Sequence, residues 1–294
     1  MSESIRVRGE GETRPAYPDL PQPLQIGTYD NHAHLEIADG ETPLSVAEQL
    51  DRMRLAGMLG AVQVGVTLES SRWSADVARN EPMLLAAVAI HPNEAPEYKS
   101  LPALDAAIAE IADLCNQPRV RAVGETGLDF YRTAGEQDLS LQLHSFEEHI
   151  AIAKEADVAL QIHDRDAHMQ VVKTLDRVGS PPRVVFHCFS GDAEFAELCA
   201  SRGWYASFAG NVTFKKNHDL RAALATMPLD LILVETDSPF LTPEPLRGRP
   251  NAPYLVPYTL RFMANLLDLD VEVLATHISQ NTERVYGSWQ EGLN

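Results

Sequence analysis

The sequence has few cysteines and no long apolar run. Its three cysteines, Cys115, Cys188 and Cys199, are an odd number without zinc-finger spacing, so neither a disulfide framework nor a structural zinc ribbon is indicated. No stretch reaches the ~18 consecutive apolar residues of a membrane span, and the N-terminus lacks the apolar core of a signal peptide. These absences predict a soluble protein of the reducing cytoplasm, with no membrane partner.

Basic residues are also scarce, since 24 Lys and Arg stand against 42 Asp and Glu, for a net charge of −18. Generic binding of nucleic-acid phosphates normally shows as a basic face, so any polyanionic substrate would have to be held locally. The excess of acid is typical of a solvated surface that keeps a protein soluble.

The chain has 294 residues, of which 45% are apolar, and this is ample for one large core. Residues 1–25 are rich in Pro, Glu and Arg, which predicts an extended or poorly ordered lead-in, or a strap over the fold. We predict no catalytic or binding residue in this lead-in.

After residue 25, short β-branched runs alternate with longer segments of helical period, the pattern of repeated βα units. Strands are predicted at 26–32, 61–66, 84–90, 119–125, 158–163, 183–187, 204–209 and 230–237. Helices are predicted at 44–58, 102–116, 136–156 and 166–178, with two closing helices at about 254–267 and 270–286.

This pattern predicts one α/β domain over residues 26–290, a single (β/α)8 TIM barrel. An open doubly wound sheet is the alternative. It is disfavoured because no GxGxxG or GxxxxGK turn follows the first strand.

Polar residues gather at the predicted C-terminal ends of the strands, where the active sites of such barrels lie. The ten histidines divide into two groups, because five stand at strand ends and five within predicted helices, where a solvated or packed histidine is expected. The strand-end residues are His32, His34, His91, Glu125, His163, His187 and Asp237. Imidazoles and carboxylates from different strands of one barrel mouth predict a metal site.

The stretch "GTYDNHAHLE", residues 27–36, is explained by strand geometry. Side chains two apart on a strand share a face, so His32 and His34 can reach one ion. Asp30, one layer deeper, can orient a ligand histidine by accepting its second N–H, or is simply a buried hydrogen-bonding acid. The same alternation puts Glu235 beneath Asp237, and we favour a role in supporting the ligands.

Imidazole and carboxylate without thiolate suit Zn²⁺, Mn²⁺, Fe²⁺ or Mg²⁺. Cys188 follows His187 directly, so we expect it to face the helix layer as an inert buried thiol. The set of six metal-ligand candidates, which leaves out His91, is larger than one tetrahedral ion needs. It indicates two ions sharing a carboxylate, the arrangement typical of phosphoryl and acyl hydrolysis.

An ordered set of motifs resembles the TatD family of metal-dependent deoxyribonucleases, within the amidohydrolase superfamily. The motifs are "DNHAHLE", "AIHP", "VGETGLDF", "LQIHDRDA", "FHCFSG", "GNVTFKK" and "ETDSPFL", and the resemblance spans about residues 28–287. Two departures stand out. About 25 residues precede the first strand, which in the family usually begins within a few residues of the N-terminus, and Ala252 takes a position often occupied by Glu.

The resemblance implies that His32, His34, Glu125 and Asp237 hold a first metal. It implies that Glu125, His163 and His187 hold a second one. It further implies a DNase, in several members a 3′ to 5′ exonuclease on single strands, working with two divalent ions such as Mg²⁺, Mn²⁺ or Zn²⁺. We expect a metal-activated water to attack phosphorus, with Asp237 accepting the proton and Glu125 bridging the ions.

Substrate contacts are predicted around the mouth. His91 is interpreted as a contact to the substrate phosphate or leaving group. Basic residues on or near the βα loops are candidates for further phosphates: Arg132, Arg165, Lys215, Lys216, Arg247 and Arg249. Phe130, Tyr131 and Phe189 are candidates for stacking on unpaired bases, or pack beneath the loops.

Two rival functions stay open. An amidohydrolase with the same metals could act on a small phosphoester, lactone or amide, although "FHCFSG" and "ETDSPFL" favour the nuclease. A metal-binding scaffold without turnover is the other rival, and intact Glu125 and Asp237 argue against it. Oligomeric state and the physiological metal are not determined by the sequence.

Overall fold

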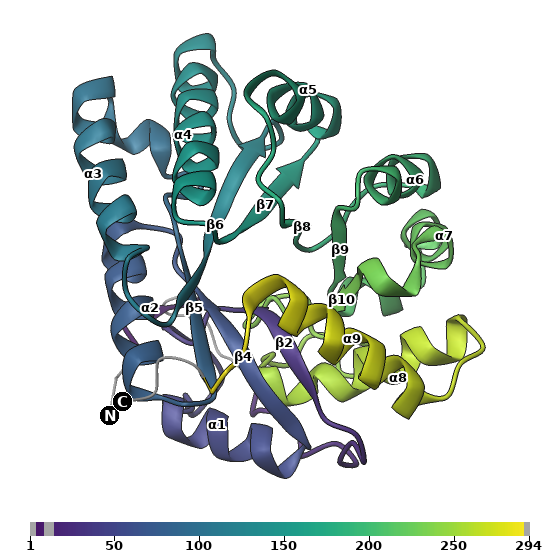
Figure 1. Cartoon of the computed structure of the whole chain (residues 1–294). Coiled ribbons are helices and arrows are strands. Elements are labelled where there is room, and N and C mark those ends of the chain that lie inside the picture. Colours follow the sequence, from purple (N-terminus) through teal and green to yellow (C-terminus); the bar gives the residue numbers. More distant parts are fainter. Residues whose placement is uncertain (1–3, 9–14, 291–294) are drawn as a thin grey trace.

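Eight parallel strands form the centre of the fold (Figure 1) in this computed structural model, which describes residues 4–8 and 15–290. Each is hydrogen-bonded to the next in chain order. They are β2 (Thr28–Ala33), β4 (Met58–Val64), β5 (Leu84–Val88), β6 (Val120–Asp129), β7 (Ala159–Arg165), β8 (Val184–Phe186), β9 (Tyr205–Phe208) and β10 (Ile232–Val234). The predicted (β/α)8 barrel is confirmed, and every predicted strand overlaps a strand of this sheet.

The ring closes between β10 and β2 through residues that follow β10. Ala33 and Ser238 form a parallel bridge, and the N–H of His34 donates to the Ser238 carbonyl at 2.8 Å. The N–H of Asp237 donates to the His32 carbonyl at 2.9 Å. The predicted strand at 230–237 is therefore too long, since Leu229–Leu231 forms a 3-10 turn and only Ile232–Val234 is strand. The N–H of Glu235 still donates to the Phe208 carbonyl of β9 at 3.1 Å, and the chain then turns to β2, where it closes the barrel.

Helices surround the strands (Figure 1). They are α1 (Val46–Leu55), α2 (Leu68–Asn80), α3 (Leu101–Leu114), α4 (Glu136–Glu155), α5 (His168–Val178), α6 (Ala193–Ser201), α7 (His218–Thr226), α8 (Val256–Leu266) and α9 (Val271–Tyr286), with 3-10 turns η1 (Ala95–Tyr98), η2 (Gly210–Thr213), η3 (Leu229–Leu231) and η4 (Pro253–Leu255). Among the described residues, none of these helices has both the length and the apolarity to cross a membrane.

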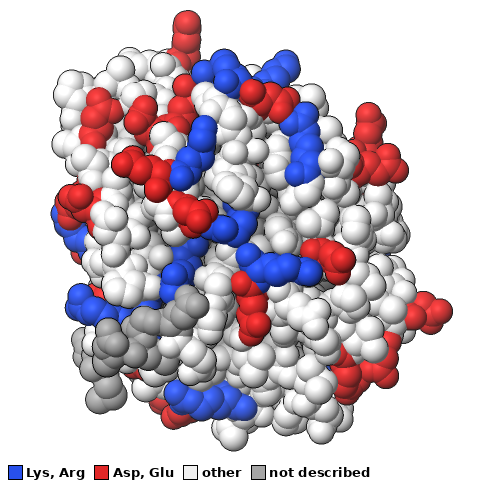
Figure 2. All heavy atoms as spheres, viewed as in Figure 1, with Lys and Arg blue, Asp and Glu red and all other residues white. Residues whose placement is uncertain are grey.

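Helix α1 shows why these segments form amphipathic helices. Ser45 begins it with a capping box, in which its side chain accepts from the Glu48 N–H and its own N–H donates to the Glu48 carboxylate. Val46, Leu50 and Met53 recur at helical spacing and are buried against the barrel. Figure 2 shows that acidic and basic side chains mix on the outer surface seen there.

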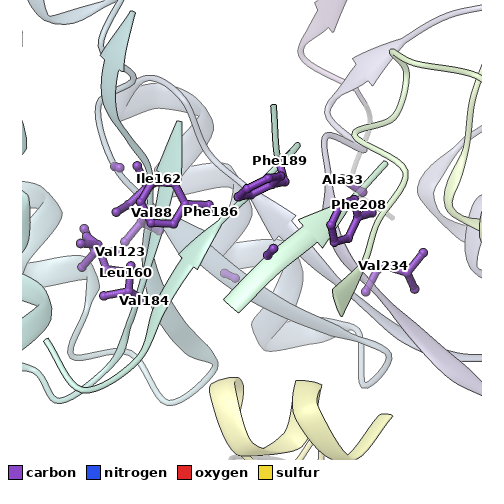
Figure 3. Close-up of a cluster of buried hydrophobic side chains, with 14 of the residues drawn as sticks. Ala33, Val88, Val123, Leu160, Ile162, Val184, Phe186, Phe189, Phe208 and Val234 are labelled. Atoms are coloured by element: carbon purple, nitrogen blue, oxygen red, sulfur yellow. The ribbon is translucent and has the colours of Figure 1, made fainter. Parts of the chain in front are cut away.

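Strand residues alternate between two apolar layers. The outer layer lies between barrel and helices, and Figure 3 shows part of it, with Val88, Val123, Leu160 and Phe186 among its members. The inner layer fills the barrel with side chains of the intervening positions: Val62, Val64, Leu85, Ala87, Ala122, Ala159, Val185 and Leu233. Each fully buried large side chain contributes roughly 1.5–3 kcal/mol to folding.

The N-terminal end of the barrel is closed by aromatic residues. Trp289 stacks on Tyr29 with ring centroids 4.1 Å apart, and the Tyr286 hydroxyl accepts from the Gln161 side chain at 2.6 Å. This floor and the inner apolar layer fill the lower barrel. The strand-end histidines and carboxylates lie at the opposite, C-terminal mouth.

The predicted lead-in is placed in two pieces, and its residues 1–3 and 9–14 lie outside the described part. Near the start of the chain, β1 (Arg6–Val7) pairs in parallel with β3 (Ile37–Ala38), which follows β2. Further on, Arg249 donates to the Ala16 and Tyr17 carbonyls, and the Tyr254 hydroxyl donates to the Pro18 carbonyl at 2.6 Å. The described part of the lead-in therefore lies against the barrel as a strap.

Candidate metal centre

A pocket of about 500 Å3 opens at the C-terminal ends of the strands. It brings together the polar residues predicted from the sequence, and its walls include His34, His91, Glu125, His163, His187 and Asp237. His32 is fully buried and in contact with this group. Seven predicted residues from six strands thus meet in one place.

Glu125 of β6 is the centre of the cluster. Its Oε1 lies 2.7 Å from His163 Nδ1, 2.8 Å from His187 Nε2 and 3.2 Å from His91 Nε2. Its Oε2 lies 3.5 Å from His32 Nε2 and 3.7 Å from His34 Nε2. One carboxylate therefore faces two sets of histidines, one with each oxygen.

Three histidines are held by their outer ring nitrogens. His34 Nδ1–H donates to the Val64 carbonyl at 2.9 Å, His187 Nδ1 lies 3.3 Å from Glu235 Oε1, and His163 Nε2 lies 3.2 Å from Asp129 Oδ2. In each ring the other nitrogen faces the cluster. This is how metal-ligating histidines are oriented in proteins, because the outer hydrogen bond fixes the ring with its inner nitrogen toward the ion.

The pair on β2 converges on one point. The Nε2 atoms of His32 and His34 are 3.2 Å apart, and Asp237 Oδ1 lies 3.5 Å from His34 Nε2. Of the described buried atoms, His32 Nδ1 is one that has no hydrogen-bond partner. These imidazole and carboxylate donors fit a divalent cation such as Zn²⁺, Mn²⁺ or Mg²⁺.

His91 differs from the other histidines in its tautomer. The Asn93 N–H donates to His91 Nδ1 at 3.0 Å, so that nitrogen carries no proton. In the neutral ring Nε2 then carries it and points toward Glu125. Although His91 lies close enough to Glu125 and His163 to complete a ligand triad, this tautomer makes it a hydrogen-bond donor and not a metal ligand.

Charges in the cluster are strongly coupled. Burial opposes ionisation of Glu125, but the charge of His187 and the hydrogen bonds of His163 and His187 outweigh it and hold the pKa of Glu125 well below its usual range. Burial lowers the pKa of His187, and Glu125 reverses this and raises it well above the usual value. The ionised Glu125 is therefore compensated by protonated histidine, a charge that a cation can replace.

Of the two roles considered for Asp30, the structure shows the buried hydrogen-bonding acid and not the support of a histidine ring. Asp30 accepts from the backbone N–H groups of His32 and Thr236 and from the Thr236 hydroxyl, and its described hydrogen bonds do not include a histidine ring. Pairing between β2 and β4 shifts register between Asp30 and Ala33, which breaks the simple alternation. Glu235 has the kind of contact that was predicted for it, since its Oε1 lies 3.3 Å from Nδ1 of the ligand candidate His187 and also accepts the N–H of Cys188 at 2.8 Å.

Cys188 lines the pocket and does not face the helix layer as expected. Its backbone is left-handed, with a φ of 43°, so the alternation that starts from His187 does not continue. Burial and the nearby carboxylate of Asp237 raise the pKa of the thiol well above its usual value. The expectation of an unreactive thiol is compatible with this protonated state.

The predicted basic contacts lie in different places. Arg132 and Arg165 line the metal pocket, and the Arg165 guanidinium lies 3.8 Å from the ring centroid of Tyr131. Arg247 and Arg249 line a second hollow, whereas Lys215 and Lys216 are exposed and are not among the described residues around either one. The guanidinium of Arg249 is engaged by the strap, so a phosphate contact from it is not supported.

Of the three aromatic candidates, Phe130 and Tyr131 are exposed beside the pocket, with 40% and 65% of their surface accessible. Phe189 is buried and packs against Phe195 and Phe208, so it belongs to the core.

Sequence reasoning missed several residues of this pocket, among them Asp129 and Arg6. Asp129 orients His163 and also accepts from Asn93 Nδ2 at 2.9 Å. Its position in "GETGLDF", four residues after Glu125 on the same strand, is a signal that could have found it. Arg6 of the lead-in also lines the pocket, and no local pattern marks it.

The fold and the site define a (β/α)8-barrel hydrolase with a histidine and carboxylate centre at the C-terminal ends of its strands. Comparisons with known proteins give the family. The model of the family described as "TatD related DNase" matches residues 29–287, so the chain belongs to that family.

Similar proteins support this assignment over nearly their whole lengths. The chain is 40% identical over 261 residues to the "Uncharacterized metal-dependent hydrolase TatD" of Mycobacterium tuberculosis, covering 88% of this chain and 97% of that one. It is 32% identical to "Uncharacterized metal-dependent hydrolase YabD" of Bacillus subtilis, covering 88% and 98%. The crystal structure of YJJV, a TatD homologue from Escherichia coli, superposes with a TM-score of 0.79 at 25% identity, covering 89% and 98%.

Proposed function

We propose that this protein hydrolyses phosphodiester bonds of DNA, as a 3′ to 5′ exonuclease on single strands that works with two divalent ions. One observation carries the proposal: three arginines, Arg6, Arg132 and Arg165, line the same pocket as the histidine and carboxylate cluster. Glu94, Asp129 and Asp164 line the pocket too, so the arginines supply positive charge at separate points of the wall. Guanidinium groups placed in this way above a metal-binding floor suit a phosphodiester better than a neutral amide or lactone. Because the whole chain carries a charge of −18, these arginines must act on a phosphate locally.

The residues present fit two divalent ions that share Glu125. His32, His34, Glu125 and Asp237 would hold the first ion, and Glu125, His163 and His187 the second. Bound in such a centre, divalent ions lower the pKa of water toward neutrality and offset the charge that builds up on a phosphoryl group. Mg²⁺, Mn²⁺ and Zn²⁺ are the ions that these donors would accept.

The chain's own groups supply proton transfer and orientation. Asp237 stands at the mouth with 14% of its side chain exposed, whereas the Glu125 side chain is 6% exposed. The more accessible Asp237 is the carboxylate placed to accept the proton of an attacking water. His91, which presents Nε2–H, is placed to donate to a phosphate or leaving-group oxygen.

The size of the pocket supports a strand end as the substrate. A volume of about 500 Å3 lies within the ~300–1,000 Å3 range of small-ligand pockets, so it suits one nucleotide at the end of a strand. The exposed rings of Phe130 and Tyr131 beside it can stack on an unpaired base.

The test uses metal-stripped protein and a single-stranded DNA oligonucleotide labelled at its 3′ end, with and without Mg²⁺ or Mn²⁺. Asp237→Asn is the inactive variant. Asp230→Asn is the matched control, because Asp230 is exposed at the opposite end of the barrel beside Arg284. We expect metal-dependent loss of the label from wild type and from Asp230→Asn, and none from Asp237→Asn.

Parallel reactions with a 5′ label, a blunt duplex and an RNA of the same sequence determine direction, strandedness and sugar. Progressive shortening of the 5′-labelled strand supports the exonuclease. No cleavage of any nucleic acid, by protein shown to bind two ions, contradicts DNA hydrolysis and directs the search to small phosphoesters, lactones and amides.

A further inference from the structure

A second hollow lies beside the metal pocket. Its volume is about 250 Å3, and Leu241 lines both spaces. This is room for a small polar group such as a phosphate. A chain emerging from the metal pocket would meet this hollow across the width of one side chain.

Arginines predominate among the described charged residues of the hollow. They are Arg8, Arg247 and Arg249, and the described carboxylate of its walls is that of Asp39. Arg249 is engaged by the carbonyls of the strap, and Arg8 donates to Asp39 at 3.2 Å. Arg247 forms no ion pair with a carboxylate among the described residues.

Donor groups remain available on two of these arginines. Both described hydrogen bonds of Arg8, to Asp39 and to the Pro239 carbonyl, leave from Nη1, so its Nε and Nη2 groups have none among the described residues. Arg247 is exposed, and its guanidinium lies 4.1 Å from the ring centroid of Phe214. Guanidinium groups of this kind bind phosphate through paired N–H donors.

The backbone of Arg8 is fixed against β3. The Arg8 N–H donates to the Ala38 carbonyl at 2.9 Å, directly after the pairing of β1 with β3. Its guanidinium also lies 4.8 Å from the ring centroid of Phe240, which lines the metal pocket. Since the family match begins at residue 29, this arginine is an addition that precedes the family domain.

We infer that this hollow binds the phosphate of the nucleotide adjoining the scissile bond, through Arg8 and Arg247. The inference rests on the proposed nuclease function and extends its substrate site by one nucleotide. It gives the lead-in a role in binding a polynucleotide, through Arg8 in the hollow and Arg6 in the metal pocket.

The experiment compares wild type with Arg247→Ala and Arg8→Ala on two substrates. One is a short single-stranded oligonucleotide that reaches both spaces, and the other is bis(4-nitrophenyl) phosphate, which reaches only the metal pocket. The control is Arg54→Ala, because Arg54 is an exposed arginine of α1 paired with Asp51. Arg247→Ala is the cleaner test, since Arg8 also contacts the carbonyl of Pro239, two residues after Asp237.

We expect each variant to raise KM for the oligonucleotide about tenfold, as for the loss of one charged hydrogen bond. The salt dependence of oligonucleotide binding should fall by roughly 0.7 in the logarithmic slope, the value for one single-strand phosphate contact. The loss of kcat/KM should be at least fivefold smaller on bis(4-nitrophenyl) phosphate, and Arg54→Ala should match wild type.

Equal effects on both substrates, or wild-type KM for the oligonucleotide in both variants, would overturn the inference while the nuclease stands. If wild type cleaves no DNA, the nuclease proposal fails by itself. Fluorescence anisotropy of the labelled oligonucleotide on wild type and Arg247→Ala then decides separately: equal affinities reject the hollow as a phosphate site, and a tenfold difference supports it.

Discussion

We predict that the buried His149 makes the folded protein less stable in acid. This histidine of α4 is fully buried, its Nδ1–H donates to the Ser145 carbonyl at 2.6 Å, and its Nε2 accepts the Ile90 N–H at 3.1 Å. Burial lowers its pKa to about 4. Protonation of His149 Nε2 would place an N–H against the N–H of Ile90. Ile90 directly precedes His91 of the metal pocket.

The sign and size follow from proton linkage. A histidine in the unfolded chain has a pKa of about 6.5, so as pH falls the unfolded state binds the proton first. The neutral His149 therefore stabilises the fold fully above about pH 6.5, and this contribution is lost progressively down to about pH 4. Between pH 7 and pH 5 the loss amounts to about 2 kcal/mol of the free energy of unfolding.

The assay is urea unfolding of wild type and His149→Gln at pH 7 and at pH 5. Glutamine offers an acceptor for the Ile90 N–H but does not titrate, and the remaining histidines titrate in both proteins and cancel. We expect wild type to lose about 2 kcal/mol more than the variant between the two pH values. Equal losses in the two proteins would refute the assignment of a neutral, buried His149.

Three further predictions concern the centre and the strap. Glu125→Gln should weaken binding of divalent ions at least 100-fold, because the Glu125 carboxylate serves both groups of histidines. Isothermal titration calorimetry measures this affinity, and a near-wild-type value would exclude a shared ligand. Asp129→Ala should weaken binding about 10–100-fold by releasing His163 Nε2, and a change limited to thermal stability would show that Asp129 is only structural. Arg249→Ala should cost about 1–3 kcal/mol in urea unfolding and expose the strap near Tyr17 to proteolysis, so an unchanged cleavage pattern would argue against this clamp.

Barrel residues at strand ends could be predicted because their signal is local. A polar residue that ends a β-branched run is recognisable in the sequence, and the barrel topology sends all such ends to one mouth. His32, His163 and His187 were found in this way. The roles of Asp30 and Cys188 were not, because a register shift and a left-handed residue break the alternation on which the reasoning depended.

By itself, the sequence determined the barrel, the family and the set of polar residues at its mouth, since periodicity and strand-end chemistry are properties of neighbouring residues. Only the tertiary structure decided which nitrogen of His91 carries its proton and which acid orients His163. It also placed Arg6 and Arg8 of the lead-in beside the site, through pairing with residues about thirty positions later in the chain. Such contacts depend on distances between segments far apart in sequence, and no local pattern of residues encodes them.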